Sequence, residues 1–147
     1  MARAMGLDVG DKTVGLALSD ALGITAQGLP TVQRKSLEAD LDAIMAICRE
    51  NDVERLVVGL PLNMDGSEGP RAEICRRFGD RLSERSGLPV EYWDERLTTA
   101  QAERVLLEAD LSRRKRKKVI DRLAAQVILQ AWMDARCART FSTDEDP

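Results

Sequence analysis

The order of hydrophobic patterns along the chain restricts the fold that it can form. Two short apolar runs, over residues 4–9 and 14–19, are joined at Gly10-Asp11 as in a β-hairpin, and a weaker run follows over 24–32. From Ser36 the apolar residues change to helical spacing, and strand and helix patterns then alternate. Three strands in a meander followed by β-α units predict an α/β fold with a mixed sheet of antiparallel and parallel strands.

The later elements are bounded by capping residues and by proline and glycine. Ser36 is expected to cap a helix that runs to about Glu50, and the apolar run over 55–60 predicts a strand buried on both faces. Pro70 and Gly87 bound a second helix, with Ile74, Phe78 and Leu82 as its expected buried positions. A fifth strand is predicted over 89–94, and two further helices over 99–108 and 112–137. Together these elements predict a five-stranded sheet with helices on both faces.

Length and composition predict one domain. The 147 residues are 44% hydrophobic, which favours a single domain over residues 1–138 and a disordered acidic tail over 139–147. No apolar run is long enough to span a bilayer and no secretory leader is recognisable, so we expect a cytoplasmic location. The cysteines Cys48, Cys75 and Cys137 form no CxxC pair and are expected to be reduced thiols.

Three carboxylates occupy positions that are unusual for surface acids, in a chain without histidine. Asp8 interrupts an apolar strand, Glu95 follows another, and Asp121 shares the helical spacing of Ala125 and Ile128. Without imidazole, water has to be activated by a carboxylate or by a metal that carboxylates hold. Oxygen ligands of this kind suit Mg²⁺ or Mn²⁺, so the sequence predicts Asp8, Glu95 and Asp121 as both metal ligands and catalytic residues.

Each of these acids also has a purely structural interpretation. Asp8 can bond to the turn at Gly10, and Asp121 can form an ion pair with Arg122. Glu95 and its neighbour Asp94 can be solvated acids in a loop, with Arg96 as their partner. Asp94 precedes Glu95, and strand alternation allows only one of the two to face the site, which leaves the choice between them open.

Basic charge is concentrated near Asp121. Residues 112–122 contain seven basic groups and one acid, which gives this segment a net charge of +6. Because the net charge of the whole chain is −3, the remaining residues together carry −9. Segregated positive charge attracts polyanions, which predicts nucleic-acid contacts from Arg113, Arg114, Lys115, Arg116, Lys117 and Lys118. A solvated basic face is the alternative, although bases at a helix N-terminus oppose the helix dipole.

The loop over residues 59–71 is a second candidate for contact with nucleic acid. It connects a buried strand to a helix, and its Asn63, Ser67 and Arg71 can bind phosphate or base edges. The same composition is typical of an ordinary turn-rich loop. Tyr92, Trp93 and Trp132 are expected to pack in the core and not to stack on bases.

Four segments resemble the motifs of the bacterial YqgF/RuvX family. They are Leu7-Asp8-Val9-Gly10, continuing to Asp20; Val57-Val58-Gly59-Leu60, continuing to Ser67; Trp93-Asp94-Glu95-Arg96, continuing to Thr99; and Asp121-Arg122-Leu123-Ala124, continuing to Leu129. The resemblance covers residues 4–137.

The resemblance implies an RNase H-like fold and a nuclease that matures the 5′ end of 16S rRNA from its precursor, with kinship to Holliday junction resolvases. The family's acids correspond to Asp8, Glu95 and Asp121. Many relatives have a Lys-Arg pair where this chain has Lys12-Thr13, so we expect the arginine contact to be absent or supplied elsewhere. Lys12 and Arg96 complete the set of predicted nucleic-acid contacts.

Other functions compete with this interpretation. The same chemistry can act on a DNA junction, for which a dimer is expected, and the oligomeric state is left open between monomer and homodimer. A binding module without cleavage, acting in transcription or ribosome assembly, is the second class. An actin-like kinase would need a second domain for adenosine, and 147 residues leave no room for it.

Overall fold

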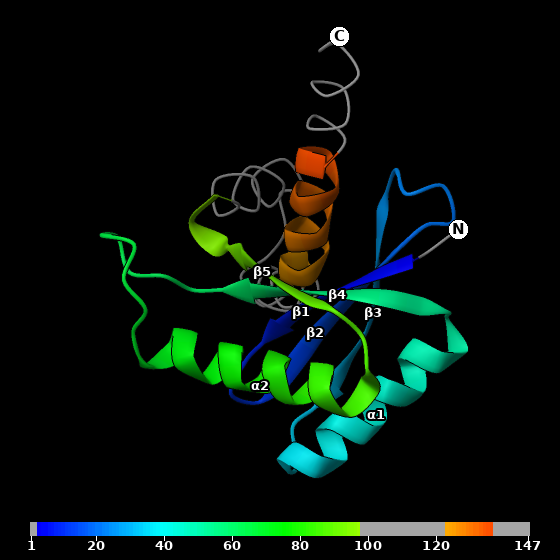
Figure 1. Cartoon of the computed structure of the whole chain (residues 1–147), viewed down its shortest axis with the longest axis horizontal. Helices are drawn as coiled ribbons and strands as arrows, with labels where there is room; N and C mark the ends of the chain where they lie inside the picture. Colours follow the sequence, from blue (N-terminus) through cyan, green and yellow to red (C-terminus); the bar gives the residue numbers. More distant parts are fainter. Residues whose placement is uncertain (1–2, 98–122, 137–147) are drawn as a thin grey trace, which may run out of the picture.

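A five-stranded mixed sheet in the order β3-β2-β1-β4-β5 forms the centre of the protein (Figure 1). The computed structural model describes residues 3–97 and 123–136. The strands are β1 (Arg3–Val9), β2 (Thr13–Ser19), β3 (Ala26–Gln33), β4 (Val53–Leu60) and β5 (Val90–Asp94). Helices α1 (Leu37–Glu50) and α2 (Pro70–Ser86) cover one face, and a helix over residues 123–136 covers the other. The predicted mixed sheet with helices on both faces is confirmed.

Strand β1 is the central strand, and it changes the direction of pairing. It pairs antiparallel with β2, where Asp8 lies opposite Gly15, and parallel with β4, where Leu7 lies opposite Val58. Strand β5 continues the parallel half, with Asp94 beside Leu60. The carboxyl ends of β1, β4 and β5 therefore meet at one edge of the sheet, where open α/β sheets usually bind ligands.

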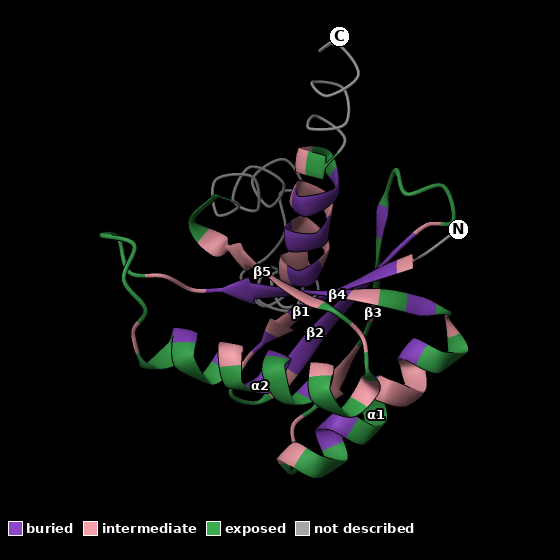
Figure 2. Ribbon diagram, viewed as in Figure 1, coloured by how far each residue is buried: buried purple, intermediate pink, exposed green. Residues whose placement is uncertain are grey.

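Two hydrophobic cores lie on opposite faces of this sheet, as the buried strands between the helix layers in Figure 2 show. Met5, Leu7 and Val9 point into the larger core with α1 and α2, and the alternate residues of β1 face the helix over 123–136. Close approach there depends on Gly6, because a Cβ at this position would lie 2.8 Å from Leu129 Cβ.

The predicted boundaries of the first two helices are confirmed, but the buried face of α2 differs from prediction. The helix predicted over 99–108 and the start of the one predicted over 112–137 lie outside the described residues. The Ser36 hydroxyl accepts a bond from Ala39 N at 3.2 Å, and Gly87 ends α2 with a φ of 76°. Ile74, predicted to be buried, is 43% exposed. The residues that α2 buries are Ala72, Cys75, Phe78, Gly79 and Leu82.

The rotation of α2 follows from its contact with Tyr92. A Cβ at Gly79 would lie 2.6 Å from the Tyr92 hydroxyl, which donates to the Arg76 carbonyl at 2.7 Å. The buried face of α2 thus combines the small residues Ala72, Cys75 and Gly79 with Phe78 and Leu82, and Ile74 turns outward. The spacing of apolar residues at every fourth position correctly predicted the helix, but it wrongly assigned Ile74, near the N-terminus of α2, to the buried face.

The tryptophans and cysteines behave as predicted. Trp132 is buried in the smaller core, and Trp93 packs against that core. Cys48 and Cys75 are free thiols, and burial raises the pKa of each to about 11, which keeps them protonated. Cys137 lies outside the described residues. Among residues 3–97 and 123–136, no helix is long and apolar enough to cross a membrane.

An arginine that the sequence did not single out fixes the turn after β1. Arg34 donates through Nε to the carboxylate of Asp40 at 3.0 Å and through Nη1 to the Gly10 carbonyl at 2.8 Å. Asp40 is only 2% exposed and also accepts from the Lys35 backbone at 3.0 Å. The buried ion pair thus connects α1 to the turn that follows Asp8.

Replacing Arg34 by leucine is expected to lower the free energy of unfolding by about 3 kcal/mol, since it leaves the buried charge of Asp40 without its cation. Urea denaturation followed by circular dichroism measures the change. The double replacement Arg34→Leu with Asp40→Leu should recover part of the loss. Equal midpoints for the Arg34→Leu variant and the wild type would contradict the prediction.

Candidate active site at the carboxyl ends of the strands

Asp8 lies near the carboxyl end of β1, on the face covered by the helix over 123–136. Because Leu7 and Val9 point into the larger core, the alternating side chain of Asp8 points to the opposite face. It is half-buried there. Its partner on β2 is Gly15, which has no side chain.

Glu95 follows β5 directly, as the first residue of the short 3₁₀ helix η1 (Glu95–Leu97), and its carboxyl group contacts that of Asp8. The pKa of Glu95 is raised to about 7, first by burial, then by the negative charge of Asp8 and by a hydrogen bond between the two carboxyl groups. Two acids that are far apart in the sequence are therefore brought together. A shared proton or a cation relieves the repulsion between such groups.

Gly59 on β4 provides the space in which Glu95 lies. A Cβ at this position would be 2.7 Å from Glu95 Oε1 and 2.5 Å from Ile128 Cδ1. Sequence reasoning did not assign Gly59 a role in the site. The signal was present, because a glycine within the apolar run Val57-Val58-Gly59-Leu60 often marks a close approach by another group.

Asp94 is directed away from the pair of acids. Its carboxylate binds the guanidinium of Arg96, with Arg96 Nη2 at 2.6 Å from Asp94 Oδ2 and Nε at 3.0 Å from both oxygens. These bonds from Arg96 lower the pKa of Asp94. Of the two neighbouring acids that alternation left open, it is Glu95 that lies against Asp8.

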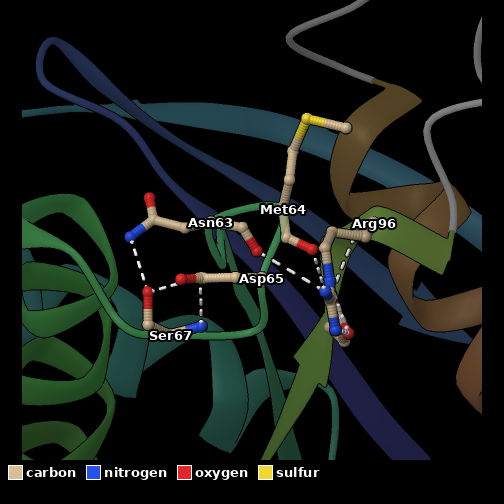
Figure 3. Close-up of polar contacts among 6 residues, drawn as sticks. Asn63, Met64, Asp65, Ser67 and Arg96 are labelled. Atoms are coloured by element: carbon tan, nitrogen blue, oxygen red, sulfur yellow. Dashed lines mark hydrogen bonds and ion pairs between the residues drawn. The ribbon is translucent and has the colours of Figure 1, made fainter.

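Arg96 also connects the strand end to the loop between β4 and α2, as Figure 3 shows. Its Nη1 donates to the carbonyl oxygens of Met64 at 3.1 Å and Asn63 at 3.4 Å. The Asn63 amide in turn donates to the Ser67 hydroxyl at 3.0 Å. Asn63 and Arg96, both predicted to contact nucleic acid, thus hold the loop in place, and their contact with nucleic acid stays a prediction.

Arg71, in the first turn of α2, lies beside the two acids. Its Nη2 donates to the Val9 carbonyl at 3.0 Å, and its Nη1 forms an ion pair with Asp11. The positive charge of Arg71 opposes the upward shift in the pKa of Glu95. Its side chain is 45% exposed, so an anion can reach it from solvent. Lys12 is exposed in the neighbouring turn.

The remaining predicted site residues lie outside the described residues. These are Asp121 and the basic residues Arg113, Arg114, Lys115, Arg116, Lys117 and Lys118. The described residues contain no group of three or more metal-ligating side chains, which is consistent with their holding two of the three predicted acids. The helix over 123–136 buries Ala125 and Ile128, the positions with which Asp121 shares its spacing in the sequence.

Solved structures with the same arrangement of elements are similar to this chain. Thermus thermophilus RuvC in complex with a Holliday junction substrate has a TM-score of 0.60 at 14% identity, covering 94% of this chain and 97% of that one. The fowlpox virus Holliday junction resolvase has a TM-score of 0.52 at 15% identity, covering 90% and 99%. The likeness confirms the predicted RNase H-like fold.

Sequence relatives are much more similar. A protein of Myxococcus xanthus is 58% identical over 99% of this chain and 95% of its own length, and one of Symbiobacterium thermophilum is 61% identical over 93% and 95%. Both carry the name "Putative pre-16S rRNA nuclease". The model of the RuvX family, described as Holliday junction resolvase, matches residues 2–135. The chain therefore belongs to the RuvX family.

Proposed function

We propose that the protein is a divalent-metal-dependent nuclease that hydrolyses phosphodiester bonds in RNA and acts in maturation of the 5′ end of 16S rRNA from its precursor. The observation that carries the proposal is the contact between the carboxyl groups of Asp8 and Glu95 at the strand ends. The names of the curated relatives support RNA as the substrate.

The chemistry of the acid pair fits a divalent cation. Both groups offer hard oxygen ligands, and the repulsion that raises the pKa of Glu95 would be relieved by positive charge between them. Asp8 and Glu95 would hold the metal together with Asp121, the third acid predicted from the sequence. When bound, Mg²⁺ or Mn²⁺ supplies activation of water and neutralisation of charge on the leaving oxygen.

The basic residues have a separate role in this proposal. Arg71 is positioned to bind a phosphate close to the acid pair, because Nη2 is fixed on the Val9 carbonyl, one residue after Asp8. The basic residues over 113–118 would hold the neighbouring backbone and make binding sensitive to salt. Lys12, in the exposed turn after β1, would add a further phosphate contact.

A cleavage assay tests the proposal with three substrates of matched length: RNA carrying the precursor 5′ extension, unstructured single-stranded RNA, and a four-way DNA junction. We expect Mn²⁺ or Mg²⁺ to be required, and a chelator to reduce cleavage of the precursor to the level without protein. The Asp8→Asn variant is the matched control and should bind RNA without cutting it. Cleavage by that variant at the wild-type rate would refute the assignment of the site.

Two other functions predict different results in the same assay. The description of the family favours a DNA junction resolvase as the second candidate, and preferential cutting of the four-way junction would select it. A non-cleaving binding module would bind RNA but neither bind Mn²⁺ in a titration nor cut any substrate.

A further inference from the structure

Met64 is the most exposed large apolar residue in the described part of the chain. It is 97% exposed, compared with 68% for Leu22 and 63% for Leu97. Its neighbours in the loop are polar, with Asn63 before it and Asp65 after it. Methionine is common at binding surfaces because its thioether is polarisable and adaptable, so a methionine that is almost fully exposed is a candidate for contact with a ligand.

Hydrogen bonds fix the backbone on both sides of Met64. Asn63 N donates to the Ser67 carbonyl, and Gly66 N donates to the Asn63 carbonyl, both at 2.9 Å. The Asp65 carboxylate accepts from the Ser67 backbone at 2.9 Å and from its hydroxyl at 2.6 Å. Because the folded protein already fixes this backbone, binding of a ligand at the loop would lose little conformational entropy.

The loop is connected through Arg96 to the strand end that carries Glu95. Arg96 donates to the Met64 carbonyl and binds Asp94, the neighbour of Glu95. Figure 1 shows the segment between β4 and α2 projecting beyond the carboxyl ends of the strands. In Figure 3 the Met64 side chain extends away from the contacts among Asn63, Asp65 and Ser67. The thioether is thus presented to solvent from a loop that Arg96 ties to the strand end before Glu95.

We propose that Met64 packs against an unpaired nucleobase adjacent to the phosphate that is cleaved. The inference rests on the proposed nuclease function and adds to it a residue that positions the substrate. A thioether is polarisable and packs on the face of any base, so the contact would favour unstacked bases over paired ones without reading sequence. This would direct the acid pair to single-stranded ends or to open junctions.

A nucleobase fits the surroundings of Met64 better than a protein partner does. A stable protein interface covers about 800 Å² on each partner, with an apolar centre formed by several residues. Met64 is instead one apolar side chain among polar neighbours. Its carbonyl accepts from Arg96, and Arg71 lies at the carboxyl end of β1. One base and its phosphate match this combination of one apolar contact and nearby positive charge.

Binding of single-stranded RNA by the Asp8→Asn protein tests the proposal without cleavage. A 2-aminopurine base is moved through successive positions of the RNA, and its fluorescence and the Kd are measured. Met64→Ser should weaken binding about fivefold and remove the fluorescence change at one or two adjacent positions. Met64→Leu should retain both, because it keeps an apolar side chain of similar volume.

Leu22→Ser is the matched control. Leu22 is also exposed, but it lies in the turn between β2 and β3, at the opposite end of β1 from Asp8. Its replacement should leave the Kd and fluorescence unchanged. The proposal is overturned if Met64→Ser equals the Asp8→Asn parent in both measurements, or if that parent does not bind RNA.

The outcomes separate this proposal from the nuclease function. A fluorescence change that depends on Met64, together with no cleavage by the wild type, would retain the base contact and refute the nuclease. Metal-dependent cleavage by the wild type, with no effect of Met64→Ser on binding or fluorescence, would retain the nuclease and refute the base contact.

Discussion

Replacing Glu95 by glutamine is expected to reduce cleavage at least about a thousandfold while making the metal-free protein more stable at pH 8. The loss of activity follows because the amide is a poor ligand for a hard cation and carries no charge. The gain in stability follows because the repulsion between Glu95 and Asp8 disappears. A loss of activity caused by damaged folding would instead be accompanied by lower stability.

The gain should depend on pH in a defined direction. Below about pH 4.5 Glu95 is protonated in both the folded and the unfolded wild type. Between about 4.5 and 7 the unfolded chain releases this proton and the folded protein retains it, so the free energy of unfolding falls as the pH rises. Above 7 the difference is constant, at up to about 3 kcal/mol.

Urea denaturation of the wild type and the Glu95→Gln variant at pH 4 and pH 8, both with a chelator, measures this effect. The midpoints should be similar at pH 4, and the variant should unfold at a higher concentration at pH 8. Glu54→Gln is a suitable control because Glu54 is exposed on β4, so its replacement should change little at either pH. A variant less stable than the wild type at pH 8 would contradict the contact between the acids.

Gly59→Ala is expected to produce the second large effect, a loss of about 2 kcal/mol of stability together with at least a hundredfold lower activity. The added methyl group would overlap both Ile128 Cδ1, at 2.5 Å, and Glu95 Oε1, at 2.7 Å. Relaxation of the core moves one of these groups, and displacement of the carboxylate separates it from Asp8. Thermal unfolding and cleavage rates at a temperature where both proteins are folded measure the two effects.

A second replacement separates packing from catalysis. Ile128→Val removes the Cδ1 methyl group that the alanine would overlap, so Gly59→Ala with Ile128→Val should recover most of the stability. Activity should stay low, because the overlap with Glu95 is unchanged. Recovery of both properties would show that Glu95 is not displaced and that the loss of activity came from packing alone.

The elements and their caps could be predicted because their signals are local. Ser36 and Gly87 bound their helices as expected, and alternation along β1 correctly separates Asp8 from the buried Leu7 and Val9. The acids themselves were found from their unusual positions and from the resemblance to a family. Their contact is consistent with that assignment, and their catalytic role stays a prediction.

The features that escaped prediction depend on contacts between distant segments. The face that α2 buries includes Gly79, which lies against Tyr92 on another element, and Ile74 is on the exposed side. The role of Arg34 arises because its guanidinium reaches Gly10 and Asp40 simultaneously, and no local pattern around Arg34 indicates this. The choice of Glu95 over Asp94 likewise required knowing which face of β5 adjoins Asp8.

The position of the two acids in the chain has a consequence for the timing of activity. Asp8 is on the first strand and Glu95 follows the last strand of the described residues, so the ribosome releases Asp8 long before Glu95 can join it. A nascent chain that has not reached residue 95 holds only one of the two carboxylates and cannot assemble the pair. For a nuclease whose proposed substrate is the precursor of ribosomal RNA, the pair therefore forms only after most of the chain has been synthesised.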